Sequence, residues 1–339
     1  MFAHPTAIIV GAGAGVEYNM PLGSTLGSDI ADAVRFRFGH YSNVPESGDR
    51  ELYNLLSRVY QNDKETLNRF TISGNELAAA ISSSVSVDDA LYQLSENAEA
   101  IKLGKMCIIR SIVKAERNSS IAYSQQNGRV DDGAGRDGWI EQLFSMAISG
   151  LKKSEIHTAF QNVTFVNFNY DRCIEHYLHV ALQRIGVSEG DSSHIVSELK
   201  MIRPYGGIGS SLATSPDNVP FGANVDALRV IGRIRTYTES DALHDSKHLL
   251  KALHDAELTI FLGFGFHAQN LHLLQLPAAR RKRVMATVKK VHEANRTDIV
   301  DALTQTLQTT ERERVELYDM TAPELLRELR LKIMMRVGG

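Results

Sequence analysis

The residues best placed to do chemistry lie between Thr164 and Asp171, where an apolar stretch gives way abruptly to polar side chains. Val163–Val166 reads as a short buried strand, and a helix begins at about Asp171. Ligands of open parallel sheets bind just beyond the carboxyl ends of the strands, so Asn169 and Asp171 occupy the expected place for a site. Asn and Asp are also favoured helix caps, and capping is the alternative interpretation of this pair taken alone.

A glycine-rich turn follows the first apolar run of the chain. Ala7–Gly11 is rich in β-branched residues, which suits a strand buried on both faces of a parallel sheet. The turn reads Gly11-Ala12-Gly13-Ala14-Gly15, and backbone amides in such a turn can bind phosphates. The dinucleotide fingerprint of dehydrogenases requires a further glycine where this chain has Val16, and an acidic strand end about twenty positions later, where Gly23–Phe38 reads as helix. The sequence therefore disfavours a dehydrogenase.

Two more glycine-dense turns occur later in the chain. Pro204–Ser210 contains Tyr205 followed by Gly206 and Gly207. Glu257–Leu262 reads as a buried strand that ends in Gly263-Phe264-Gly265, with Asn270 beyond it. Because the carboxyl ends of parallel strands meet at one edge of a sheet, we expect the three turns to converge there. We expect the glycines at 206–207 and 263–265 to leave space for a ligand.

The elements that must position these residues alternate between strand and helix, which predicts an α/β fold. Further strands are expected at Val284–Val288 and Val315–Tyr318, a helix at Asp298–Leu307, and a last helix that begins in the capping box Thr321–Glu324. We predict one domain over 1–339: a Rossmann-like, doubly wound parallel sheet built from about 1–30 and 160–339, with a large helical insertion at about 31–160. Helical spacing of apolar residues within that insertion is found at Glu51–Tyr60, Val87–Leu94, Ala98–Ala115 and Trp139–Leu151.

Bulk composition restricts the class of protein. The chain has 339 residues and a formal net charge of -3, which gives no reason to expect a nucleic-acid or membrane surface. Cys107 and Cys173 are too few for a disulfide framework or a four-cysteine zinc site. His176 and His179 lie three apart on a predicted helix without a third ligand nearby, so we expect no metal. The first apolar run leads into glycines and reads as a strand, not a signal peptide, and we expect a cytoplasmic protein.

Four stretches occur in an order known from one family: the Gly11–Gly15 turn with Met20-Pro21, Phe168–Asp171, Tyr205-Gly206, and Phe261–Phe266 with Asn270. Together they resemble the sirtuin-like (Sir2-like) family of NAD-consuming enzymes, across nearly the whole chain. Asn19 stands where the family pattern has glycine before the hydrophobic-Pro pair. Phe168–Asp171 is similar to the Asn-Tyr-Asp signature of the bacterial branch, and Ser86–Asp89 resembles a helix start common there.

The resemblance implies an NAD⁺ hydrolase that cleaves the nicotinamide–ribose bond and releases nicotinamide and ADP-ribose, or a cyclised form. Protein-deacetylating sirtuins carry a zinc module held by four cysteines, which this chain cannot build. The zinc-free bacterial branch implies abortive infection in antiviral defence, a homo-oligomer, and a partner such as a hexameric ATPase. The resemblance assigns catalytic positions to Asn169, Asp171 and Tyr205, and positions that bind NAD⁺ to Gly11, Ala12, Gly13, Ala14, Gly15, Pro21, Gly206, Gly263, Gly265 and Asn270.

One departure from the family pattern bears on the chemistry. Tyr205 stands at the position of the family's histidine, and a tyrosine with a pKa of about 10 is a poor base at neutral pH. Three interpretations stay open. Asn169 and the Tyr205 hydroxyl position the ribose and a water; or another histidine, such as His267, substitutes; or the protein binds NAD⁺ or ADP-ribose without cutting it and regulates a partner.

Overall fold

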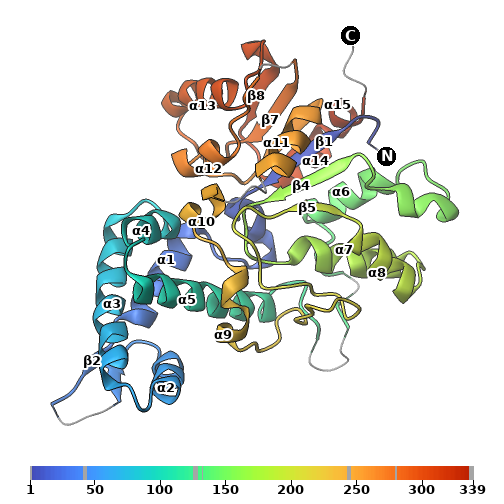
Figure 1. The fold of residues 1–339 in the computed structure, drawn as a ribbon. Coiled ribbons are helices and arrows are strands. Elements are labelled where there is room, and N and C mark those ends of the chain that lie inside the picture. Colours follow the sequence, from blue (N-terminus) through green and yellow to red (C-terminus); the bar gives the residue numbers. More distant parts are fainter. Residues whose placement is uncertain are drawn as a thin grey trace.

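A computed structural model describes residues 2–40, 44–124, 129–131, 133–242, 246–278 and 281–335. Within these residues, six strands form one parallel sheet with the order β5-β4-β1-β6-β7-β8. With the strands of this sheet renumbered along the chain, the order is that of the Rossmann fold, three strands on each side of a switch point between β1 and β6. The predicted α/β fold with a doubly wound parallel sheet is confirmed (Figure 1). The strands are β1 (Thr6–Val10), β4 (Val163–Asn167), β5 (Lys200–Ile202), β6 (Leu258–Leu262), β7 (Arg283–Thr287) and β8 (Val315–Tyr318).

The central strands separate two apolar cores. Every residue of β1 and of β6 is buried, which is why both read as continuous apolar runs. Successive side chains of β1 point to opposite faces, so Ile8 and Val10 join one core, and Ala7 and Ile9 the other. The core on the side of Ile8 is covered by α6 (Trp139–Ile148), α7 (Cys173–Arg184), α8 (Glu189–Ser197), α14 (Ala322–Glu328) and α15 (Arg330–Met334).

The opposite core is larger because a helical body extends it. α11 (Ser246–Asp255), α12 (Ala268–Leu273) and α13 (Glu293–Thr306) cover the sheet on this side. The helical body projects from the same side and lies at the lower left of Figure 1. It comprises α1 (Gly23–Val34), the β2–β3 hairpin (Arg37–Phe38 and Pro45–Ser47), α2 (Arg50–Val59), α3 (Lys64–Ser83), α4 (Val87–Gln93) and α5 (Ala98–Arg117).

Packing places the borders of this body differently from the predicted insertion of about 31–160. α1 belongs to it, because α1 packs against α3 and α5. α6 does not, because α6 packs against α7 and α14 over the sheet, with Trp139 buried in that core. The remaining short elements are α9 (Ala227–Val230), α10 (Tyr237–Ala242), and the 3₁₀ helices Ala12–Tyr18, Lys153–Thr158, Ile231–Arg233 and Arg312–Arg314.

Helix starts follow local capping chemistry. Asp49, Asp63, Ser86 and Asn97 each accept a backbone hydrogen bond from the first turn of α2, α3, α4 and α5. The predicted capping box of the last helix is confirmed, with Thr321 and Glu324 exchanging hydrogen bonds and Pro323 in the first turn. Within the described residues, no helix is long and apolar enough to cross a membrane.

Candidate functional site

The glycine turn after β1 packs directly on the glycine turn after β6. The amide of Gly11 donates to the Leu262 carbonyl at 3.0 Å, and that of Gly13 donates to Gly263 at 2.9 Å. A Cβ on Gly11 would lie 2.6 Å from the Gly263 oxygen, and a Cβ on Gly263, whose φ is +57°, would overlap the backbone of Gly13 and Ala14. Convergence of these two turns at the switch point is therefore what the structure shows.

This packing corrects two expectations about the turns. The amides of Gly11, Gly13 and Ala14 already donate to protein carbonyls, so the expectation that amides throughout residues 11–15 hold phosphates is wrong for these three. The expected ligand space beside Gly263 is filled by the 11–15 turn. Gly206 and Gly207 do border a cavity, although a Cβ on Gly206 would overlap the Arg233 carbonyl. These glycines are needed because two backbones touch.

The other predicted turn residues take different places. Ala12 and Pro21 are half-buried, and Gly13 and Gly265 are exposed. Gly15 is buried against Met20, which a Cβ would approach to 2.8 Å. After Pro21, α1 begins at Gly23 without a side-chain cap, and Gly23, Ser24 and Thr25 in its first turn are exposed. The positive end of the helix dipole there faces solvent.

Asn169 joins the end of β4 to the glycine turn after β1. Its side-chain Nδ2 donates to the Gly11 carbonyl at 3.1 Å, which leaves Oδ1 as its free-standing acceptor group. Its backbone is held from both sides: the amide donates to Asn167 Oδ1 at 3.0 Å, and the carbonyl accepts from Arg203 at 2.9 Å. Arg203 is in turn fixed by both carboxylate oxygens of Glu175.

Asn167 is a polar residue of this edge that the sequence prediction missed. It is buried, and its Nδ2 finds no hydrogen-bond partner among the described residues. A buried amide group without a partner is costly, and such groups concentrate at functional sites. The sequence feature that could have identified Asn167 is an amide side chain at the last position of a buried strand.

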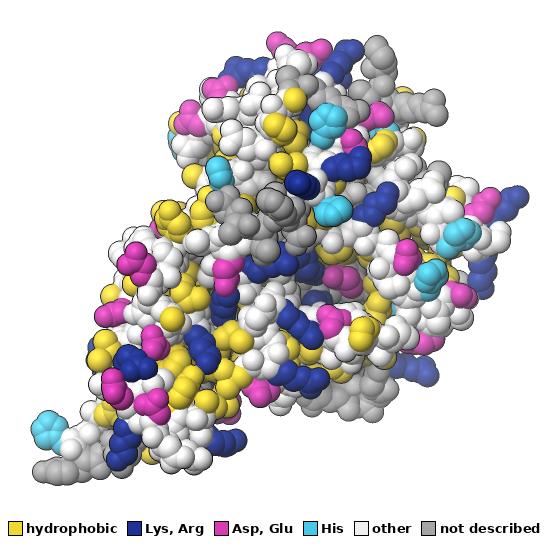
Figure 2. Space-filling model, viewed as in Figure 1, with side chains coloured by type: hydrophobic (Ala, Val, Ile, Leu, Met, Phe, Trp, Pro, Cys, Tyr) yellow, Lys and Arg dark blue, Asp and Glu magenta, His cyan; other side chains and the backbone are white. Residues whose placement is uncertain are grey.

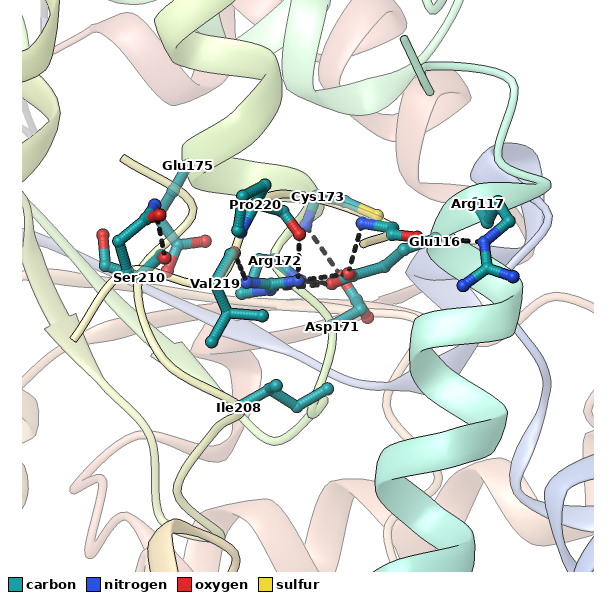
Figure 3. A network of polar contacts seen from close by, with 12 residues as sticks. Glu116, Arg117, Asp171, Arg172, Cys173, Glu175, Ile208, Ser210, Val219 and Pro220 are labelled. Atoms are coloured by element: carbon teal, nitrogen blue, oxygen red, sulfur yellow. Dashed lines mark hydrogen bonds and ion pairs between the residues drawn. The ribbon is translucent and has the colours of Figure 1, made fainter. Parts of the chain in front are cut away.

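Asp171 lies one residue before the N-cap of α7, which is Arg172, and its side chain contacts the first turn of that helix. It is buried, and its Oδ1 accepts from the Cys173 amide at 3.0 Å in the first turn of α7. Next to it, Arg172 and Glu116 form an ion pair in which both side chains are almost fully buried. Figure 3 shows how Glu116 of α5 reaches Arg172, whose guanidinium also donates to the carbonyls of Val219 and Pro220. The helical body is thus tied to the sheet directly behind Asp171.

Tyr205 and Asn270 are brought together although 65 residues separate them. The Tyr205 hydroxyl donates to Asn270 Oδ1 at 2.6 Å. The Tyr205 ring is buried against Phe168 and Tyr170, with ring centroids 5.8 and 6.1 Å away. Burial raises the pKa of Tyr205 far above its ordinary value, so this phenol acts as a hydrogen-bond donor and not as a base.

Asp88 is a second residue of this cluster that the sequence indicated only as part of a helix start. It lies half-buried in the first turn of α4, and its Oδ1 accepts from the Tyr170 hydroxyl at 3.2 Å. Burial raises the pKa of Asp88 to about 6, although the hydrogen bond from Tyr170 lowers it. Nothing in the spacing of the sequence relates Asp88 to Tyr170, because the contact joins the helical body to the sheet.

A large cavity lies beside the edge strand β5 and the glycine-dense turn that follows it, and not over the turns after β1 and β6. It has a volume of about 1530 Å³ and is lined by residues of β5, α8, α11 and the 203–217 segment. Lys and Arg side chains gather around a hollow near the middle of the face drawn in Figure 2. Of the predicted site residues, only Gly206 lines this cavity, and Arg203 connects it to the Asn169 backbone.

Of the histidines that the sequence singled out, His176 and His179 are buried, whereas the His267 ring lies against Gly265 in the turn after β6. The interpretation that His267 replaces the family's histidine stays a prediction. His176 is buried, bonds to the Ile121 carbonyl at 2.8 Å through Nε2, and stacks on Phe221 at 4.0 Å. His179 is buried beside Ser193, and His267 is exposed before α12. In the part of the chain that the structure describes, no group of three His, Cys, Asp or Glu residues is placed to hold a metal ion.

No family model matches the chain, and no curated protein matches it.

Proposed function

We propose that the protein is an NAD⁺ hydrolase that cleaves the nicotinamide–ribose bond at the carboxyl edge of the sheet. The observation that carries the proposal is the hydrogen bond from Asn169 to Gly11. It places a side chain with a free acceptor at the mouth of the glycine turn, beside the switch point where Rossmann-like sheets bind nucleotides. The pairing of Tyr205 with Asn270 adds two further positions of the sirtuin-like pattern to the same edge.

The chemistry requires few groups. Breaking the bond between nicotinamide and ribose passes through an oxocarbenium-like state, as in glycoside hydrolysis. Asn169 Oδ1 accepts a hydrogen bond from a ribose hydroxyl or from the attacking water, because Nδ2 is already committed to Gly11. The buried Asp171 carboxylate lies behind the site and favours the positive charge that develops on the ribose.

The pyrophosphate needs donors other than the occupied amides of Gly11, Gly13 and Ala14. The exposed first turn of α1 supplies them, since its amides have no side-chain cap and the helix dipole favours an anion there. Pro21 and the glycine turn then lie along the bound nucleotide. In this proposal residues 11–21, which resemble the family's opening loop, lead to α1, and the N-terminus of α1 binds the negatively charged pyrophosphate.

The same resemblance supports the biological part of the proposal: an abortive-infection effector of bacterial antiviral defence, acting in the cytoplasm. Unregulated NAD⁺ cleavage would kill the host cell, so the activity requires control. We propose a homo-oligomer and a partner of the hexameric ATPase type as the means of control.

A second candidate function is a sensor that binds NAD⁺ or ADP-ribose and regulates a partner without cleaving its ligand. The observation that favours it is the Tyr205–Asn270 hydrogen bond, which puts a non-basic phenol where the family has histidine. The two functions separate in one experiment: calorimetric titration of the purified protein with NAD⁺, followed by chromatography of the same sample for nicotinamide and ADP-ribose, with and without lysate from infected cells.

Binding with product formation supports the hydrolase, and binding without product under every condition supports the sensor. Absence of binding contradicts both. Asn169→Ala is the test variant, and Asn162→Ala is the matched control. Asn162 lies just before the first residue of β4, at the end of the strand away from Asn169, and its Nδ2 donates to the Phe2 carbonyl at 2.9 Å.

A further inference from the structure

Hydrolysis at this edge needs a group that accepts a proton from the attacking water. The carboxylate of Asp171 already accepts the Cys173 amide, and Tyr205 donates its hydroxyl proton to Asn270. Asn169 does not titrate. Glu175 is paired with Arg203, which donates to the Asn169 carbonyl. Asp88 is half-buried where Asp171 is buried, and its side chain reaches the cluster through the Tyr170 hydroxyl at 3.2 Å.

The surroundings of Asp88 suit a base. Burial raises the pKa of this carboxyl to about 6, close to working pH, where a general base combines sufficient basicity with the right protonation state. Tyr170 and Tyr205 face it from the ends of β4 and β5. Glu239 of α10 is nearby too, but its carboxylate is paired with Lys105 of α5 at 2.6 Å.

Another carboxyl with a raised pKa has a different assignment. Burial raises the pKa of Glu17 to about 7, yet its Oε1 accepts the Trp139 amide at 2.8 Å at the start of α6. Glu17 therefore caps a helix. Asp88 differs because its side chain accepts from the Tyr170 hydroxyl, which belongs to the Asn-Tyr-Asp stretch itself.

We propose that Asp88 is the general base of the NAD⁺ hydrolase, an inference that rests on the proposed function. The oxygen of a water attacks C1′ of the nicotinamide ribose while the C1′–N bond breaks. The electron pair of the C1′–N bond stays on the nicotinamide nitrogen and neutralises its positive charge. One proton of that water passes to the Asp88 carboxylate and is then released to solvent. The balance is NAD⁺ plus water giving nicotinamide, ADP-ribose and one proton.

The position of Asp88 also gives the helical body a part in the site. Asp88 belongs to α4 in that body, whereas Asn169 and Tyr205 follow strands of the sheet. The base reaches the reacting atoms only when α4 is seated against Tyr170. Assembly that moves the helical body would thus switch turnover without altering Asn169.

The test measures nicotinamide release by the full-length protein at saturating NAD⁺ between pH 5 and pH 8. Asp88→Asn, which keeps an oxygen for the Tyr170 hydroxyl, is expected to lower kcat by about 10²–10⁴-fold with little change in KM. Asp89→Asn is the matched control in the same helical turn, because the Asp89 carboxylate accepts from Gln93 on the surface of α4, at 3.2 Å, and not from the Asn-Tyr-Asp stretch. It is expected to keep wild-type turnover.

A second variant tests whether the pKa of Asp88 sets the pH dependence of kcat. Tyr170→Phe removes the hydrogen bond that lowers the Asp88 pKa, so the acidic limb of the kcat profile, expected near pH 6 in the wild type, should move to higher pH. An Asp88→Asn protein with wild-type kcat, or an unmoved limb in Tyr170→Phe, overturns the assignment of Asp88 while the hydrolase stands. A wild-type protein that binds NAD⁺ without cleaving it overturns the hydrolase and the base together.

Discussion

The buried ion pair between Glu116 and Arg172 offers the sharpest test of how the helical body is held on the sheet. Glu116 has no exposed surface, and its carboxylate accepts from the Arg172 amide, from the Arg172 guanidinium and from the Gly222 amide at 3.1 Å. In Glu116→Gln, the shape is kept, but the negative charge is lost and an NH₂ group faces these donors. Breaking one partner of a buried pair costs about 3–5 kcal/mol, because the other charge is left uncompensated.

The assay is urea denaturation followed by circular dichroism, with the free energy of unfolding taken by linear extrapolation. Asp301→Asn is the control, because the Asp301–Arg312 pair is exposed and such pairs contribute less than about 1 kcal/mol. The double variant Glu116→Leu/Arg172→Met removes both charges, but the amides of Arg172 and Gly222 then lose their acceptor, so it should recover only part of the loss. An unfolding free energy of Glu116→Gln within error of wild type would refute the reasoning.

Two further predictions concern the cores. Burial lowers the pKa of His176 to about 3 against 6.5 for a free side chain, so the unfolded chain takes up a proton that the folded protein refuses. The free energy of unfolding should therefore fall as pH drops from about 6.5 towards 3, and less steeply in His176→Gln. If the thermal midpoints of the wild type and His176→Gln fall equally over this pH range, the prediction is wrong. Gly263→Ala should lose at least about 1–3 kcal/mol from backbone strain, whereas Gly23→Ala, which meets open space, should be nearly neutral. Equal urea midpoints for these two variants would contradict the packing described for the glycine turns.

Much of the sheet was predictable because central parallel strands carry their burial in their own residues. β1, β4, β6, β7 and β8 lie within two residues of the predicted bounds, and the helices α2, α4 and α5 likewise. The sequence prediction did not name α3, although its apolar residues Phe70, Leu77 and Ala78 face the core. Leu67 and Ile81 pack against the same core, and Gly74 serves the close approach of α3 to Val34 of α1. Propensity alone cannot show this, because the reason lies in another helix.

The candidate site was predictable only in part, for a related reason. Motif order placed Asn169, Tyr205 and Asn270 at one edge, and the fold brings them there. What the glycine turn does with its amides depends on the carbonyls of Leu262 and Gly263, which are distant in sequence. The contact of Asp88 with Tyr170 likewise depends on how α4 is seated on the sheet. Residue types predict which groups can act, and packing decides which of them are free.

The most direct test of the central claim is the rate of nicotinamide release at saturating NAD⁺ by the wild type, Asn169→Ala and Asn162→Ala. The account predicts turnover in the wild type, the same turnover in Asn162→Ala, and a loss of at least about 10²-fold in Asn169→Ala with NAD⁺ affinity largely retained. Turnover in Asn169→Ala equal to that of the wild type would contradict the placement of the reaction at the Asn169–Gly11 contact.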